Sequence, residues 1–139
     1  MASVYFAAPL FCKAELDFNA QLAQSLRLNG HTVFLPQEHT PDTDLSPITG
    51  RDARRSVFRA DLSVIDGCDL FLMILDGRVP DEGACFELGY AYARGKTCIG
   101  MKTDVRTSEA GGDNIMLEGA LEFGVARSVP ELLSMIEGM

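Results

Sequence analysis

Short apolar runs alternate along the chain with stretches of helical periodicity. In the first kind of segment apolar residues follow one another or alternate, as in strands, and in the second they recur every three or four positions, as in helices. The strand-type runs are Ser3–Ala8, Thr32–Leu35, Asp69–Leu75, Thr97–Met101 and Val125–Val129. The helical segments are Lys13–Asn29, Arg51–Ile65, Asp81–Arg94 and the short Asn114–Leu121, and Pro130 is expected at the first position of a last helix.

The order of these segments predicts an α/β protein. Strands that alternate with helices form a parallel sheet, because each helix carries the chain back across it. Residues 69–75 are almost all apolar, as expected for a central strand with helices on both faces. The length of 139 residues fits one domain, residues 1–139, which we expect to be a sandwich of helices around a parallel sheet.

Two predicted helices have apolar positions that should pack on the sheet. In the helix 13–29 these are Leu16, Ala20, Ala23 and Leu26, with Leu28 beside them. In the helix 51–65 they are Val57, Ala60, Leu62, Val64 and Ile65.

Ligands of open α/β sheets bind beyond the carboxyl ends of the strands. Pro36–Gly50 lies at that edge and is long for a loop in a compact domain, which predicts a lid or a binding loop. Thr103–Asp113 contains two adjacent glycines and is expected to be a second, flexible loop. The segments at this edge are Ala7–Cys12, Pro36–Gly50, Asp76–Glu82 and Thr103–Asn114.

Composition and charge argue against several classes of protein. The net charge of −8 disfavours a nucleic-acid polymer as partner. No apolar run approaches the ~18–20 residues of a membrane span, and the first run begins at residue 4, so we expect neither a membrane anchor nor a signal peptide. The four cysteines form no CxxC pair and have no His at metal-ligand spacing, which indicates free thiols in a reducing, cytoplasmic compartment, with a structural disulfide as the minor alternative.

The segment 81-DEGACFELGY-90 places a carboxylate, Glu87, among small and apolar residues near a predicted helix start. Asp81 is a candidate N-cap of that helix, and Gly83 keeps its first turn slim enough for a ligand to approach the backbone. A helix N-terminus favours negative charge. A carboxylate that stays ionised there and faces a pocket suits nucleophilic or electrostatic work at a cationic carbon.

Four segments of the chain form a joint pattern: 4-VYFAAPLF-11, 59-RADLSVIDGCD-69, 76-DGRVPDEGACFELGYAYARGK-96 and 113-DNIMLEG-119. The specific part is D-x-G-x-x-x-E-x-G-x-A, which begins at Asp81 and includes Glu87. In this order and spacing the segments resemble the nucleoside 2-deoxyribosyltransferase family, over nearly the whole chain. The resemblance implies a flavodoxin-like (Rossmann-like) three-layer sandwich with a five-stranded parallel sheet. It also implies an enzyme that moves a 2-deoxyribosyl group between nucleobases.

The resemblance also assigns roles to residues. Glu87 falls on the nucleophile that attacks C1′ and forms a deoxyribosyl-enzyme ester, which a second base, or water, then resolves. Tyr5 matches the residue that orients this carboxylate, and Asp61 matches the acid that meets the nucleobase, a role that needs a pKa raised by burial. The positions matched to substrate binding are Asp81 near the sugar hydroxyls, Ala7, Gly83, and Asn114 and Met116 from a segment that typically enters a neighbouring subunit's site.

The implied partners are a 2′-deoxynucleoside and a free nucleobase, with no metal or redox cofactor. Because the segment 114–116 would complete a neighbour's site, the resemblance implies a homo-oligomer with shared active sites. A dimer is the minimum, and a tetramer or a hexamer is a further option.

Each candidate residue also has an ordinary structural interpretation. A Glu in the first turns of a helix is commonly a solvated residue that complements the dipole. Tyr5 in a strand commonly packs in a core, and Asp61 on a helix commonly lies at the surface. Asp81 and Asn114 suit plain helix caps, and Met116 alone suits a core. Only the joint pattern favours a site.

Two other functions stay open. Related members of the superfamily hydrolyse 2′-deoxynucleoside 5′-monophosphates and should carry Gly, Ser and Arg as phosphate donors just after the first strand. Here 7-AAPLFCKAE-15 offers only Lys13 as a cation, although Arg78 and Ser108 could add phosphate contacts. The third interpretation is a nucleotide-binding module without turnover, which the complete set of matched site residues disfavours.

Overall fold

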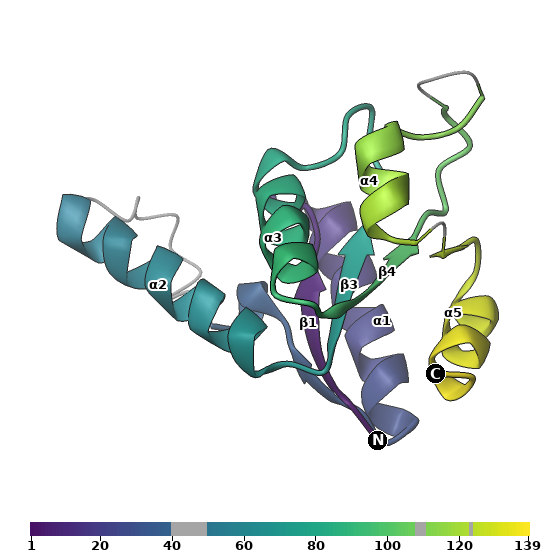
Figure 1. Cartoon of the computed structure of the whole chain (residues 1–139), viewed down its shortest axis with the longest axis horizontal. Helices are drawn as coiled ribbons and strands as arrows, with labels where there is room; N and C mark the ends of the chain where they lie inside the picture. Colours follow the sequence, from purple (N-terminus) through teal and green to yellow (C-terminus); the bar gives the residue numbers. More distant parts are fainter. Residues whose placement is uncertain (40–49, 108–110, 123) are drawn as a thin grey trace.

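Five parallel strands form one sheet in the computed structural model, which describes residues 1–39, 50–107, 111–122 and 124–139 (Figure 1). The strands are hydrogen-bonded in the order β2-β1-β3-β4-β5. This is the strand order of flavodoxin-like proteins, so the predicted fold class is confirmed. The strands are β1 (Ser3–Ala7), β2 (Thr32–Phe34), β3 (Leu70–Ile74), β4 (Thr97–Met101) and β5 (Val125–Ala126).

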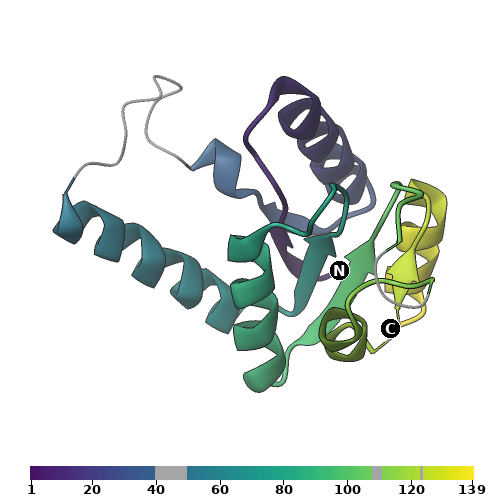
Figure 2. The same ribbon diagram turned by 90° about the horizontal axis from the view of Figure 1, so that it is seen from above.

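Helices cover both faces of the sheet (Figure 2). On one face lie α1 (Lys13–Leu28) and α5 (Val129–Glu137). On the other face lie the second half of α2 (Arg51–Gly67), α3 (Glu82–Ala93) and the short α4 (Ile115–Ala120). A 3-10 turn, η1 (Pro36–Glu38), follows β2.

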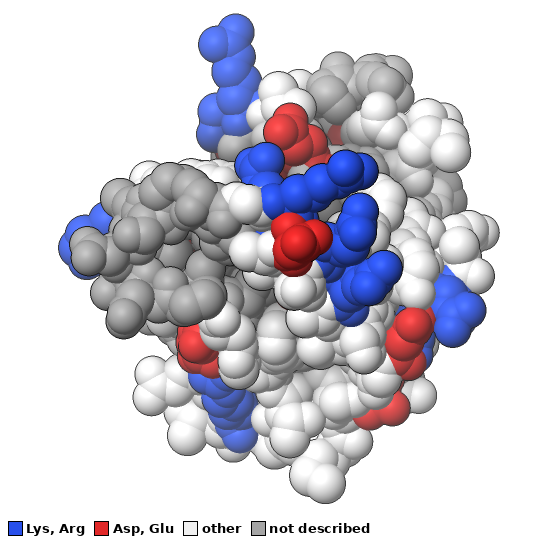
Figure 3. Space-filling model, turned by 90° about the vertical axis from the view of Figure 1, so that its left-hand side faces the viewer, with Lys and Arg blue, Asp and Glu red and all other residues white. Residues whose placement is uncertain are grey.

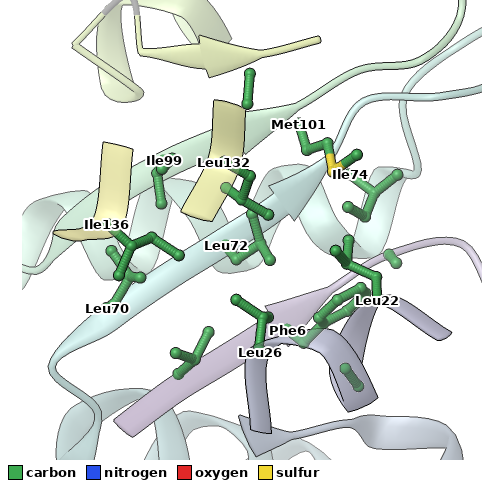
Figure 4. Close-up of a cluster of buried hydrophobic side chains, with 14 of the residues drawn as sticks. Phe6, Leu22, Leu26, Leu70, Leu72, Ile74, Ile99, Met101, Leu132 and Ile136 are labelled. Atoms are coloured by element: carbon green, nitrogen blue, oxygen red, sulfur yellow. The ribbon is translucent and has the colours of Figure 1, made fainter. Parts of the chain in front are cut away.

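Side chains of the strands alternate between two cores, as the pleat of a β-strand requires. In β3, Leu70, Leu72 and Ile74 enter the core shared with α1 and α5 (Figure 4). Phe71 and Met73 enter the core beneath α2, α3 and α4. Every residue of β3 is buried, which confirms the prediction of a strand covered on both faces.

The last strand is shorter than the predicted run 125–129. β5 ends at Ala126, because Ser128 caps α5 by accepting a hydrogen bond from the Glu131 N–H at 3.3 Å. Pro130 is therefore the second residue of α5 rather than the first. Its missing N–H costs nothing there either, since the first four N–H groups of a helix have no partner within it.

The apolar face predicted for α1 is only partly right. Ala23 and Leu26 are buried, but Ala20 and Leu28 are exposed. A polar residue, Asn19, is buried instead, because its side-chain amide donates to the Pro9 carbonyl at 2.9 Å and to the Gln37 side chain at 3.1 Å. These bonds offset the cost of removing an amide from water.

The first half of α2 projects from the body of the molecule (Figures 1 and 2). Every residue from 51 to 60 is exposed, so Val57 and Ala60 do not pack on the sheet as predicted. The second half of the helix packs in the core, through Ile65 and its neighbours, and the exposed Phe58 ring lies 5.8 Å from that of Phe86. Basic side chains gather at this end of the molecule (Figure 3), where α2 carries the exposed Arg51, Arg54, Arg55 and Arg59.

The described ends of the loop after β4 are held by an ion pair and hydrogen bonds. Lys102 and Asp113 are both buried and form an ion pair, and the Lys102 ammonium also donates to the Arg106 carbonyl. The Asp113 N–H donates to the Glu118 carboxylate at 2.9 Å. Ser108 and most of the predicted lid lie outside the described residues.

All four cysteines are free thiols, and Cys68 and Cys98 are buried. Within the residues that the structure describes, no helix is long and apolar enough to cross a membrane.

Gly100 in β4 offers a test of how the sheet packs beneath α4. A Cβ added there would lie 2.9 Å from the Leu121 side chain and 3.1 Å from that of Val125, closer than ordinary contact. We expect Gly100→Val to lower the free energy of unfolding by about 1–3 kcal/mol, as overpacked cores do. Urea unfolding monitored by circular dichroism measures this change.

The control is Gly67→Ala at the end of α2, where a Cβ meets nothing within 4 Å. It should change the free energy of unfolding by less than about 0.5 kcal/mol. Equal losses in the two variants would contradict the close packing at Gly100.

Candidate active site

Glu87 lies on the second turn of α3, on the side of the helix between the sheet and α2. On one side of it the helix is anchored to α2, where the Tyr90 hydroxyl donates to the Asp66 carboxylate at 2.9 Å. On the other side of Glu87 are three buried residues of α3, all within about 100° of Glu87 around the helix axis. These residues are Ala84, Leu88 and Ala91.

A hydrogen bond from a buried phenol meets the Glu87 carboxylate. The Tyr5 hydroxyl donates to Glu87 Oε1 at 2.7 Å, and Tyr5 is 0% exposed. Its ring is stacked between Phe34 and Phe71, with centroids 5.5 and 5.6 Å away. These two residues are its register partners on β2 and β3, so the sheet itself fixes the direction of the hydroxyl.

Burial raises the pKa of Glu87 to about 7. The nearby carboxylates of Asp61 and Asp81 act in the same direction, while the hydrogen bond from Tyr5 lowers the pKa. The sequence led us to expect a carboxylate kept ionised by the helix N-terminus. Loss of hydration outweighs that effect here, because Glu87 is largely withdrawn from water and two acids lie close by.

The neighbouring acids and phenol have pKa values that fit distinct roles. Burial raises the pKa of Asp61, which is the direction that proton donation requires. Burial, and then the charge of Glu87, raise the pKa of Tyr5, so its hydroxyl remains a donor at neutral pH.

Asp81 caps α3, as its position in the sequence predicted. Its Oδ2 accepts a hydrogen bond from the Ala84 N–H at 2.8 Å. A Cβ on Gly83 would lie 3.1 Å from that oxygen, so a larger residue would crowd the cap. Ala7 is buried at the end of β1. An open hollow of about 510 Å³ begins beside the cap and is lined by Phe11, Val79, Pro80, Asp81, Glu82 and Gly83.

Met116 lies on the opposite side of α3 from Glu87. It is 76% exposed and lines a hollow of about 390 Å³ between α3 and α4, together with Cys85 and Gly89. Those two positions stand about 160–200° around the helix from Glu87. Asn114 caps α4 by accepting a hydrogen bond from the Met116 N–H at 3.0 Å. One chain therefore brings together Tyr5, Asp61, Asp81 and Glu87, but not Met116.

Sequence reasoning missed the aromatic support of this site. Phe34 and Phe71 appear in the sequence only as apolar strand residues, and their stacking on Tyr5 depends on the strand register. No group of three His, Cys, Asp or Glu side chains suited to a metal occurs among the described residues.

The model of the nucleoside 2-deoxyribosyltransferase family matches residues 4–126, so the chain belongs to that family. No curated protein matches it in sequence. Among solved structures, a conserved protein from Enterococcus faecalis V583 is 28% identical with a TM-score of 0.83, covering 99% of this chain and 98% of its own. The 2-deoxyribosyltransferase of Bacillus psychrosaccharolyticus is 27% identical with a TM-score of 0.80, covering 95% and 90%.

A more distant structure shares the fold. The 2-desoxiribosyltransferase of Leishmania mexicana is 21% identical with a TM-score of 0.72, and the alignment covers 99% of this chain and 98% of that one.

The raised pKa of Glu87 has a consequence for stability. Its folded-state pKa of about 7 lies above the ordinary value of 4.5. The native state therefore binds the proton more tightly than the unfolded state, and this contribution, complete below pH 4.5, is lost as the pH rises through 7. Glu87→Gln removes this dependence, so its stability relative to the wild type should rise by up to about 3 kcal/mol between pH 4.5 and 8. Urea unfolding at a series of pH values measures it.

Tyr5→Phe provides the matched comparison, because it removes the hydrogen bond that lowers the pKa of Glu87. With Glu87 retained, the loss of stability should extend to higher pH than in the wild type. A pH-independent difference between Glu87→Gln and the wild type would contradict the burial of an ionisable Glu87.

Proposed function

We propose that this protein is a nucleoside 2-deoxyribosyltransferase that works through a covalent deoxyribosyl-Glu87 intermediate. The observation that supports this most is the half-buried Glu87 carboxylate, which lies near Asp61 and accepts a hydrogen bond from the Tyr5 hydroxyl at 2.7 Å. Family membership supports a pentosyl-transfer or N-glycosidase chemistry for this carboxylate.

In the first half of the reaction, ionised Glu87 attacks C1′ of the deoxynucleoside. The C1′–N bond breaks, its electron pair leaves with the base, and protonated Asp61 donates a proton to that base. In the second half, a nitrogen of the incoming base attacks C1′, the ester bond breaks, and Asp61 takes up the proton released. The two displacements retain the anomeric configuration.

Tyr5 and Asp81 position the reacting groups in this scheme. Tyr5 binds Oε1 of Glu87, which leaves Oε2 as the attacking oxygen. Asp81 uses Oδ2 for its helix cap, which leaves Oδ1 for a sugar hydroxyl. We propose further contacts of the sugar with the backbone at Ala7 and Gly83.

Product chromatography tests the function. Wild-type protein incubated with a 2′-deoxynucleoside and a different free base should yield a new deoxynucleoside. Because Glu87 must be ionised and Asp61 protonated, kcat/KM should rise with pH as Glu87 ionises, with a pKa of about 7, and fall at higher pH as Asp61 loses its proton. Glu87→Ala should lose at least about 10³-fold in rate while still binding a nucleobase.

A parallel incubation with a 2′-deoxynucleoside 5′-monophosphate alone separates the alternatives. Release of deoxyribose 5-phosphate only there would move the protein to the hydrolases. A structure of the same fold, the CMP N-glycosidase of Clostridium botulinum, is 20% identical with a TM-score of 0.58, covering 97% of this chain and 98% of its own. Lys13, the cation of the first loop, is paired with Asp17 at 2.8 Å, which weakens the case for a phosphate contact there. Binding of nucleobase without turnover of either substrate would indicate a binding module.

We also propose a cytoplasmic homo-oligomer, acting in deoxynucleoside salvage, in which Asn114 and Met116 complete a neighbour's site. The exposed apolar side chains on three helices support an interface. These apolar side chains are Phe58 on α2, Phe86 and Tyr92 on α3, and Ile115 and Met116 on α4. The proposed cytoplasmic location rests on the four cysteines, which are free thiols.

Mixing two inactive variants tests the sharing of sites. Glu87→Ala and Asn114→Ala damage the same site from different subunits in this arrangement. After unfolding and refolding together, mixed dimers would contain one intact site, so up to about a quarter of the wild-type activity should return, as random pairing dictates. Full activity in a strictly monomeric protein would contradict shared sites.

A further inference from the structure

Two carboxylates join the ends of β3 and β4 to each other at the carboxyl edge of the sheet. Asp76, just after β3, accepts hydrogen bonds from the Thr103 N–H at 2.7 Å and the Thr103 hydroxyl at 2.6 Å. It also accepts the Asp104 N–H at 2.8 Å. In return Asp104 accepts the Gly77 N–H at 3.1 Å. We call Asp76 and Asp104 with these partners the carboxylate clasp.

Arg106 keeps the second carboxylate of the clasp charged. Its guanidinium and its backbone N–H both bind Asp104, and these bonds hold the pKa of Asp104 well below its usual range. Asp104 therefore remains an acceptor for the Gly77 N–H throughout the neutral range.

The clasp fixes where two functional segments begin. Gly77 opens the short loop that leads to Asp81, and its φ of +124° is one that L side chains rarely adopt. Within the described chain, the bond to Asp104 is the only hydrogen bond that residues 77–80 make. On the other strand, Thr103 opens the segment that leads to Asn114.

We propose that Asp76 and Asp104 are positioning residues, which fix the start of the loop bearing Asp81 so that the Asp81 carboxylate meets the substrate in the right place. This inference rests on the proposed function. A displacement of about 1 Å at a reacting group can cost about 100-fold in rate, so a tie of this kind affects turnover without touching the substrate.

A similar tie at the opposite edge of the sheet gives the matched control. Asp69, just before β3, accepts the Ser3 N–H at 2.8 Å and the Ser3 hydroxyl at 2.7 Å. It joins β3 to β1 at their amino ends, away from the loops that carry the site residues. Loss of this tie should cost stability but not positioning.

The test compares Asp76→Ala, Asp76→Asn and Asp69→Ala in the full-length protein. We expect Asp76→Ala to lower kcat/KM by about 10- to 100-fold, with a loss in kcat. The kcat/KM of Asp69→Ala should stay within about twofold of the wild-type value, although both variants lose a similar amount of stability. Asp76→Asn keeps an acceptor oxygen for the two backbone N–H groups and should restore most of the rate. Equal kinetics in Asp76→Ala and Asp69→Ala, or no rescue by Asp76→Asn, would overturn the proposal.

A second readout does not depend on turnover. Because Asp81 helps to raise the pKa of Glu87, loosening its loop should lower that pKa below about 7. Carboxyl NMR titration of Glu87 should show this shift in Asp76→Ala and not in Asp69→Ala. If the wild-type protein transfers no deoxyribosyl group, the proposed function is wrong, but the titration still tests the positioning role of the clasp. An unchanged pKa of Glu87 in Asp76→Ala would refute that role.

Discussion

The hydrogen bond between Tyr5 and Glu87 depends on a buried phenol of the sheet lying beneath the second turn of a helix. Burial makes the carboxyl hold its proton more tightly, and the phenol partly reverses this. The result is a carboxyl with a pKa of about 7. A carboxylate of raised proton affinity is a stronger nucleophile than a solvated one, while a useful fraction stays ionised at neutral pH. The balance between burial and one hydrogen bond therefore sets how reactive Glu87 is.

Distant parts of the chain must converge to keep that balance. Strand register places Tyr5 between Phe34 and Phe71, which prevents the ring from turning away. The bond between Tyr90 and Asp66 holds α3 against α2, and with it the separation of Glu87 from Asp61. A change in either support would alter the solvation of Glu87 before it altered any contact with a substrate.

Periodicity alone predicted the order of strands and helices, because most elements bury one regular face. It was wrong where a polar residue satisfied its hydrogen bonds inside, as Asn19 does, and where the first half of α2 stays exposed in the described structure. The early end of β5 had a visible signal, since 128-SVPE-131 has the Ser and Glu spacing of a capping box. The local motif indicated Asp81 and Glu87, but the protonation of Glu87 depends on burial by residues far away in sequence. The partners of Asp76 lie 27 and 28 positions away, so only the fold reveals them.

The charge of the site also bears on the choice of substrate. Asp61 and Asp81 lie close enough to raise the pKa of Glu87, and no Lys or Arg of the described chain forms an ion pair with any of these three acids. Negative charge of this kind stabilises a sugar that becomes cationic as its glycosidic bond breaks. It repels a phosphate dianion unless separate cations compensate. In the proposed reaction, the same electrostatics would favour an uncharged deoxynucleoside over its 5′-monophosphate.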